Sequence, residues 1–193
     1  YYGHATAASQ QNATGVWDSN FSGVWHLEES ATDEQTTATH YDSTSPADNG
    51  TQSGNASIAG GQVDGAQDFD GTNDRIDAGT GGAMSADWSI GAWVKTPSSL
   101  PTTDRVIAGR TGDNPWPQNY VLHAGYGDNP DNFAVGSSTD SYIRARSATV
   151  PVAGTWYHIA GTFVSATKVY TIYVNGVQDG TATGTTNPPT TGG

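Results

Sequence analysis

Acidic and amide side chains gather in two turn-rich parts of the sequence, and their chemistry is that of a calcium site. In the first part, Asp113 and Asn114 lie between two strand patterns, and Asp128 and Asp131 lie in the next connection. Ca²⁺ takes about six to eight oxygen ligands from carboxylates, amides and carbonyls. The pattern therefore predicts a Ca²⁺ ion at these residues. The alternative is that they only form turns, by capping their own backbone.

A second group, Asp42, Asp70 and Asp74, has the same chemistry. The run from Asp70 to Asp74 is similar to a calcium-loop fragment but lacks the spacing and the closing Glu of an EF-hand. We expect a structural Ca²⁺ that ties the long loop 30–49 to the sheet. A hairpin turn at residues 71–73 between two strands explains the same residues without an ion, and the two interpretations are not exclusive.

Aromatic residues near the first group suit sugar binding, because the apolar side of a sugar ring stacks on Trp or Tyr while amides and carboxylates bond its hydroxyls. Trp116 lies between two prolines and is predicted to be exposed in a loop. If the loops that carry Asp113 and Asp128 lie at the same end of the fold, the sugar site would also include Tyr126, Tyr142 and Arg144. His123 would then be a further hydrogen-bond donor. The alternative is that the Trp116 side chain packs against the protein and fixes the loop in place.

The glutamates do not suit glycan cleavage, which needs two facing carboxylates. All three, Glu28, Glu29 and Glu34, lie before residue 35. Glu28 and Glu29 are adjacent, so they point to opposite faces of a strand. We therefore expect no enzymatic activity and keep glycan cleavage as a minor alternative.

Four other tryptophans fall within strand patterns, and we expect them in the core. They are Trp25, Trp88, Trp93 and Trp156. His26 and His158 flank such residues without metal-ligand spacing. We expect these histidines on a solvent face or in hydrogen bonds.

Composition limits the class of protein. The chain has 193 residues, enough for one sizeable β-sandwich, and only 13% of them are charged. Seven Lys and Arg against nineteen Asp and Glu give a net charge of −12, so a nucleic acid would be repelled. No apolar run approaches the about 18 residues of a membrane-spanning helix, so we expect no membrane insertion. Calcium, or a neutral partner such as a sugar, fits this composition better.

The lack of cysteine would suit a bacterial or archaeal surface protein that does not depend on oxidation. The first residues lack the charged and apolar regions of a signal peptide. We expect a mature or excised piece of a longer secreted or cell-surface protein.

Short strand patterns recur along the chain, each bounded by Gly, Asn, Asp, Pro or Ser. They are predicted at residues 66–70, 75–78, 88–96, 105–109, 120–125, 132–136, 142–147, 156–164, 168–174 and 178–183. This number of strands with tight turns predicts an all-β fold, a two-sheet antiparallel β-sandwich of the jelly-roll type. The last three strands should form two hairpins, the second through Asn175-Gly176, a preferred type I′ turn pair.

The flanking segments complete the predicted organisation. Residues 1–22 are predicted to be an arm or the tail of a preceding domain, and residues 23–183 the sandwich. Within it, residues 23–28 should form the first strand and residues 30–49 a loop. Residues 184–193 contain two prolines and are predicted to be a linker or a truncated end.

Several motifs resemble the laminin-G-like jelly-roll family of the concanavalin A-like lectin/glucanase superfamily. The main motif is the run 156–163 followed by the run 170–177. Supporting motifs stand in the family's order at residues 24–27, 42–45, 48–51, 69–76 and 89–94. The resemblance covers about residues 23–183. Residues 1–3 and 16–18 also look like the end of an uncharacterised domain that precedes such jelly rolls in bacterial and archaeal surface proteins.

The resemblance implies a binding module, and in pentraxin-like relatives a Ca²⁺ that bridges to the ligand sits in a loop comparable to 113–131. Family members usually close with a further strand, and this chain stops at Gly193 before such a strand. An unpaired sheet edge would invite the N-terminal arm or a neighbouring copy to add a strand. The alternative is that the last strand has been removed.

Two functional hypotheses follow. The first is a non-catalytic extracellular module that binds a glycan or a surface protein with the help of Ca²⁺. The second is a structural or adhesive subunit whose copies are joined by strand exchange.

Overall fold

The computed structural model describes residues 12–29, 38–45, 47–54, 56–63, 65–79, 86–100, 103, 105–111, 118–126, 129–137 and 143–188. Within these ranges the side chains of residues 13, 14, 58, 111, 118, 119, 126 and 129–131 are not described. The chain divides into two compact units, residues 1–82 and 83–193, each with its own sheets.

In its described part, the first unit contains one short helix and five short strands. These are α1 (Ala13–Val16), β1 (Thr39–His40), β2 (Gly50–Ser53), β3 (Ser57–Gly60), β4 (Gly65–Asp68) and β5 (Arg75–Asp77). An antiparallel sheet has the order β1-β2-β5, and β3 and β4 form a separate hairpin. Asn12 caps α1, because its side-chain oxygen accepts a hydrogen bond from the Gly15 amide at 3.0 Å.

The first unit corrects three predictions. Residues 23–28 form only an isolated bridge between Trp25 and Asp42, rather than a strand of the sandwich. β1 lies within the predicted loop 30–49, and α1 lies within the predicted arm. With two and four residues, these elements are too short to leave a periodic pattern in the sequence.

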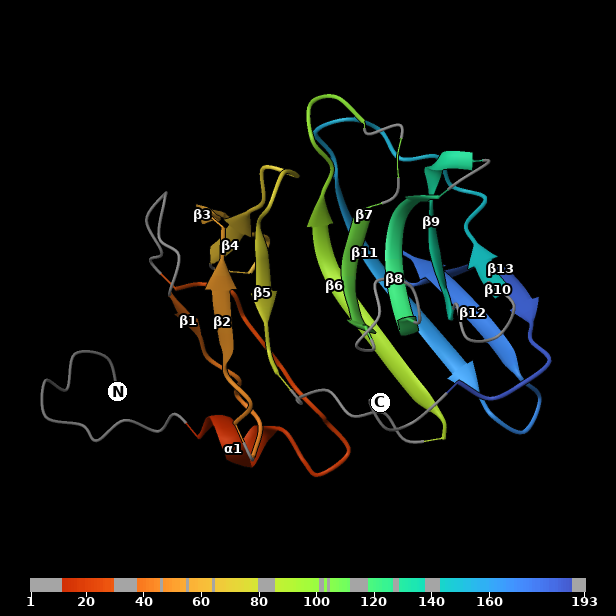
Figure 1. Ribbon diagram of the computed structural model, residues 1–193, viewed down its shortest axis with the longest axis horizontal. Helices are drawn as coiled ribbons and strands as arrows, with labels where there is room; N and C mark the ends of the chain where they lie inside the picture. Colours follow the sequence, from red (N-terminus) through yellow and green to blue (C-terminus); the bar gives the residue numbers. More distant parts are fainter. Residues whose placement is uncertain are drawn as a thin grey trace, which may run out of the picture. The chain divides into compact units, whose positions relative to one another are not determined.

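The second unit confirms the all-β, two-sheet antiparallel sandwich (Figure 1). Its strands are β6 (Trp88–Lys95), β7 (Arg105–Thr111), β8 (Gln118–Tyr126), β9 (Asn129–Ser137), β10 (Ile143–Arg146), β11 (Trp156–Val164), β12 (Val169–Val174) and β13 (Val177–Thr183). One sheet has the order β10-β9-β8-β7 and the other the order β13-β12-β11-β6. All neighbouring strands in both sheets are antiparallel.

Both predicted hairpins are confirmed. β11 pairs with β12 along their length, and β12 pairs with β13. Asn175 and Gly176 have φ angles of 51° and 81°, as a type I′ turn requires. The register between β12 and β13 shifts after Ile172, which leaves Asp179 as the extra residue of a bulge.

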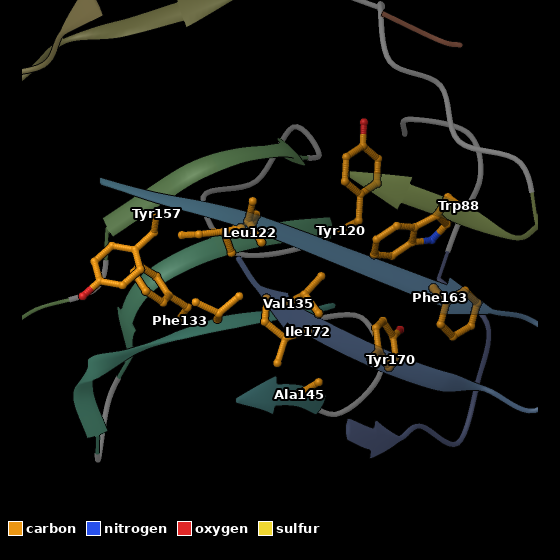
Figure 2. Packing of buried hydrophobic residues seen from close by; sticks show 12 residues of the cluster. Trp88, Tyr120, Leu122, Phe133, Val135, Ala145, Tyr157, Phe163, Tyr170 and Ile172 are labelled. Carbon is orange, nitrogen blue, oxygen red and sulfur yellow. The ribbon is translucent and has the colours of Figure 1, made fainter. Parts of the chain in front are cut away.

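The core of the sandwich lies between its two sheets (Figure 2). The buried cluster comprises Trp88, Tyr120, Leu122, Phe133, Val135, Ala145, Tyr157, Ile159, Phe163, Tyr170, Ile172 and Val174. Phe163 lies at one end of the cluster (Figure 2), with its ring centroid 5.8 Å from that of Trp88 and 4.6 Å from that of Tyr170. Alternation along each strand brings these residues inward and directs their neighbours to the opposite face of the sheet.

The edge strands β10 and β13 approach closely on one side of the sandwich. A Cβ atom on Gly180 would lie 1.9 Å from the carbonyl oxygen of Arg146, so this contact requires glycine. Next to it, the Ala148 amide donates to the Asp179 carbonyl at 3.0 Å, and the Thr149 amide donates to the Asp179 carboxylate at 2.9 Å. Hydrogen bonds to the backbone and the side chain of Asp179 therefore hold the two sheets together on this side.

Both sheets of the sandwich lie between residues 88 and 183. The predicted domain limits at residues 22/23 and 183/184 stay predictions. In the described part of the chain, the helix is too short to cross a membrane.

Candidate ligand-binding face

Most of the predicted loop site lies outside the described residues. This applies to Trp116, Tyr142, Asp113, Asn114 and Asp128. Tyr126 ends β8 and Asp131 lies in β9, but their side chains are not described. The roles of these residues as sugar or calcium ligands stay predictions.

Arg144 belongs to the same predicted site and lies on the outer side of the sheet β10-β9-β8-β7. It pairs with Gly136, and a Cβ atom on that glycine would lie 2.9 Å from Arg144 Cδ, so the arginine side chain extends over the glycine. Val121 pairs with Gly136 from the other side, and His123 lies two positions further along β8. Val121 and His123 are 1% and 2% exposed. The role of Arg144 as a sugar ligand, with His123 as a further donor, stays a prediction.

Asp42 organises the loop 42–49 through its carboxylate. Oδ1 accepts hydrogen bonds from the amides of Val24 and Thr44 at 2.8 and 2.9 Å. Oδ2 accepts from the Thr44 hydroxyl at 2.7 Å and from the Asp48 amide at 3.1 Å. Burial raises the pKa of Asp42, but these hydrogen bonds outweigh it and hold the pKa below its ordinary value. Donors surround both oxygens, which favours the turn interpretation at Asp42.

Asp70 and Asp74 stabilise the turn between β4 and β5. Asp74 Oδ2 accepts from the Asp70 amide at 2.8 Å, and Asp70 Oδ1 accepts from the Thr72 amide at 2.6 Å. β4 and β5 belong to different sheets, so this turn is not the hairpin that the sequence suggested. Among the described residues, no group of three or more His, Asp or Glu could hold a metal ion. Calcium at Asp42, Asp70 and Asp74 stays a prediction.

Calcium binding can be measured by thermal melting after EDTA treatment, with and without millimolar Ca²⁺. We expect Ca²⁺ to raise Tm, because an ion bound only by the folded state stabilises it by about 2.7 kcal/mol at a hundredfold excess over Kd. Loss of the rise in Asp113→Ala would assign the ion to the loop residues 113–131, and its loss in Asp74→Ala would assign the ion to the group of Asp42, Asp70 and Asp74. Equal Tm values with and without Ca²⁺ would contradict the calcium prediction.

A buried polar network joins β1 and β2 in the first unit. His40 is fully buried, with Nδ1 2.9 Å from Glu29 Oε2 and Nε2 3.0 Å from Gln52 Oε1. The Tyr41 amide donates to Glu29 Oε1 at 2.7 Å. Partial burial raises the pKa of Glu29, but the hydrogen bonds from the Tyr41 amide and from His40 lower it below its ordinary value. Glu29 therefore has a structural role.

An open hollow of about 540 Å³ lies on the first unit. Its lining is polar and includes Asp48, Asn49, Thr51, Arg75 and Asp77. None of its described lining residues is aromatic, so it lacks the stacking surface on which sugar sites depend.

The sheet β13-β12-β11-β6 has an outer face that points away from the core, which we call the Trp93 face. Register and alternation place the following residues on it. They are Ser89, Gly91, Trp93 and Lys95 of β6, Trp156, His158, Ala160, Thr162 and Val164 of β11, Val169, Thr171 and Tyr173 of β12, and Gln178, Thr181 and Thr183 of β13. Small and polar side chains predominate around its aromatic residues.

Trp93 is 50% exposed, which corrects its prediction as a core residue. Trp88 and Trp93 are five positions apart on one strand, so they point to opposite faces, and Trp88 is the buried one. Trp156 is half-buried and lies on the same outer face, so its prediction as a core residue is also wrong. Trp25 is half-buried in the first unit. The alternation of side chains within β6 indicates that Trp93 points away from the core. The prediction relied on the residue type instead and therefore placed Trp93 in the core.

Trp93 and His158 are cross-strand partners in contact. Their ring centroids lie 5.3 Å apart, with an angle of 62° between the planes. The imidazole extends over Gly91, where an added Cβ atom would lie 3.8 Å from His158 Nε2. The pair thus presents an exposed apolar ring beside a group that can donate or accept hydrogen bonds.

Comparisons with known proteins agree with this fold. A family model described as the concanavalin A-like lectin/glucanases superfamily matches residues 70–193. Domain 4 of AbnA, a GH43 extracellular arabinanase from Geobacillus stearothermophilus solved in complex with arabinotriose, is similar with a TM-score of 0.52 and 22% identity, over 70% of this chain and 61% of that chain.

A protein from Bacteroides ovatus ATCC 8483, assigned as a carbohydrate-binding protein, has a TM-score of 0.40 and 22% identity over 51% of this chain and 26% of that chain. The chain therefore spans less than two thirds of the length of either structure. No curated protein matches the sequence.

Proposed function

Because the chain belongs to the concanavalin A-like lectin/glucanases superfamily, we propose that it is a non-catalytic module that binds a glycan on the Trp93 face. The observation that carries the proposal is the half-exposed Trp93 in contact with His158. Both residues lie in the sandwich, within the part of the chain that the family model matches.

The chemistry of the Trp93 face supports a sugar ligand. Exposing the apolar surface of a large ring to water costs about 25 cal/mol of free energy for each Å². The C–H side of a sugar ring covers such a surface, while its hydroxyls bond polar groups at the edge. His158 beside the indole and Thr162 further along β11 supply such polar groups.

The solved relative supports the same class of ligand. Domain 4 of AbnA was solved with arabinotriose and belongs to an extracellular enzyme. A glycan ligand and a secreted or cell-surface setting are therefore our proposals for this chain. Calcium assistance from the loop residues 113–131 remains part of the proposal.

The position of Glu29 supports a binding role rather than catalysis. Its two carboxylate oxygens face His40 and the Tyr41 amide, in a network that stabilises the first unit. Its neighbour Glu28 is exposed. Neither arrangement offers the pair of facing carboxylates that glycan cleavage needs.

The structural-subunit hypothesis rests on the sheet edges. Among the described strands, β6 and β7 each pair on one side. Strand exchange between copies through such an edge, and binding of a surface protein, stay predictions.

Replacing Trp93 with alanine is expected to weaken glycan binding by about 10- to 100-fold, because burial of a large apolar side chain contributes about 1.5–3 kcal/mol. Affinity electrophoresis in gels containing different polysaccharides measures the effect. Tyr41→Ala is the matched control, since it removes an aromatic residue that is 61% exposed in the first unit. Equal retardation of the wild type and the Trp93→Ala variant would overturn the proposed site.

A further inference from the structure

We propose that the Trp93 face selects glycans that carry negative charge, such as polymers of uronic acids or sulfated sugars. This inference rests on the proposed function, because it assigns a ligand class to the same face. It runs against the net charge of −12, which by itself favours neutral ligands. The charges close to Trp93, rather than the net charge, determine whether this face prefers charged or neutral glycans.

Basic side chains lie beside Trp93 on this face. Lys95 follows Trp93 by two positions, so both side chains point to the same side of β6. Lys95 is exposed and pairs with Trp156, and His158 lies directly across from Trp93. Among the residues of β6, β11, β12 and β13 that form the Trp93 face, none is Asp or Glu.

The carboxylates nearest to this face along the chain lie at its margins and accept hydrogen bonds there. Asp87 lies six positions before Trp93, about 20 Å along an extended strand. Its Oδ1 accepts from the amide and the hydroxyl of Ser165 at 2.7 and 2.6 Å. At the other edge of the sheet, Asp179 Oδ2 accepts from the Thr149 amide. In the described part of the chain, no carboxylate forms a salt bridge with Lys95.

The distances favour a local effect of Lys95. Two positions along a strand span about 7 Å, so an acidic group on the sugar stacked on Trp93, or on the next sugar, comes within reach of the ammonium group. Charges in solution at physiological ionic strength are screened beyond about 8 Å. The distant carboxylates that produce the net charge therefore act weakly here, and the nearby ammonium group of Lys95 dominates.

The geometry of the sheet also suits the interior of a chain polymer. The Trp93 face follows four paired strands and includes the small residues Gly91 and Ala160 beside the Trp93–His158 pair. Such a surface accepts a sugar in the middle of a polymer as well as one at its end. In a polymer whose every sugar is acidic, each possible position of the polymer on the face brings one charged group near Lys95.

The experiment compares polymers that differ in charge alone. Polygalacturonate is paired with its methyl ester, and dextran sulfate with dextran, and binding to the full chain is measured by affinity electrophoresis at low and physiological salt. We expect the charged member of at least one pair to bind at least several-fold more tightly, with affinity that falls at 0.5 M salt. The two pairs distinguish carboxylate from sulfate as the preferred group.

Charge variants then localise the effect. Lys95→Gln should weaken binding of the charged polymer by about fivefold, as expected for one exposed ion pair. Lys168→Gln, which removes the same charge from the turn between β11 and β12, should leave it unchanged. Equal binding of charged and neutral polymers, or equal effects of the two variants, would overturn this inference and leave the proposed function intact. Failure of all four polymers and of neutral arabinan to bind would overturn both.

Discussion

Replacing Asp42 with alanine is expected to unfold much of the first unit, at a cost of about 3–5 kcal/mol. The carboxylate is 7% exposed and accepts hydrogen bonds from the amides of Val24, Thr44 and Asp48 as well as from a hydroxyl. Each buried donor left without an acceptor costs about 1–3 kcal/mol. Because natural domains are stable by about 5–15 kcal/mol, such a loss would remove most of the stability of a unit this small.

Hydrogen exchange measures this effect at the three amides directly. In the wild type, the Val24, Thr44 and Asp48 amides should be protected, and the protection should vanish in Asp42→Ala. Asp68→Ala, which removes an exposed carboxylate of β4, is the control and should change stability by at most about 0.5 kcal/mol. Unchanged protection in Asp42→Ala would contradict the role assigned to this carboxylate.

The pH dependence has a definite sign. The folded state holds the pKa of Asp42 below its ordinary value, so its contribution is complete above the unfolded pKa of about 3.9. The contribution is lost as the pH falls through the lower, folded pKa. Asp42→Ala should remove this part of the acid sensitivity.

Replacing Phe163 with alanine is expected to destabilise the second unit by about 3–5 kcal/mol. Phe163 is 1% exposed and contacts the rings of Trp88 and Tyr170, so its removal leaves a cavity between the two sheets (Figure 2). Urea unfolding followed by circular dichroism measures the change. The control is Val164→Ala, at the next residue of β11, because Val164 points to the opposite face and is 41% exposed. Similar losses in the two variants would contradict the assigned position of the core.

Local patterns were enough to predict the second unit. β11 begins and ends at the predicted residues, because its inward and outward side chains alternate and turns bound it on both sides. The turn at Asn175-Gly176 was predictable since this pair favours the positive φ angles that the hairpin requires. Such features depend on neighbours in the sequence and can be inferred without knowledge of the rest of the fold.

The candidate face and the first unit were less predictable. Trp93 was misplaced because its residue type suggested the core, although the strand pattern put it opposite to Trp88. The contacts of Asp42 reach 18 residues back to Val24, and those of His40 join Glu29 to Gln52. Contacts between residues so far apart in the sequence leave no periodic signal in it.

Glycan binding at the Trp93 face can be tested by an NMR titration that follows the indole N–H signals of the six tryptophans. The titrant is a soluble oligosaccharide prepared from a polysaccharide that retards the wild-type chain. We expect the Trp93 signal to shift saturably, together with the backbone signals of Lys95 and His158, while the signal of the buried Trp88 stays in place. Saturable shifts at Trp116 with an unchanged Trp93 signal would contradict this expectation and place the ligand at the predicted loop site instead.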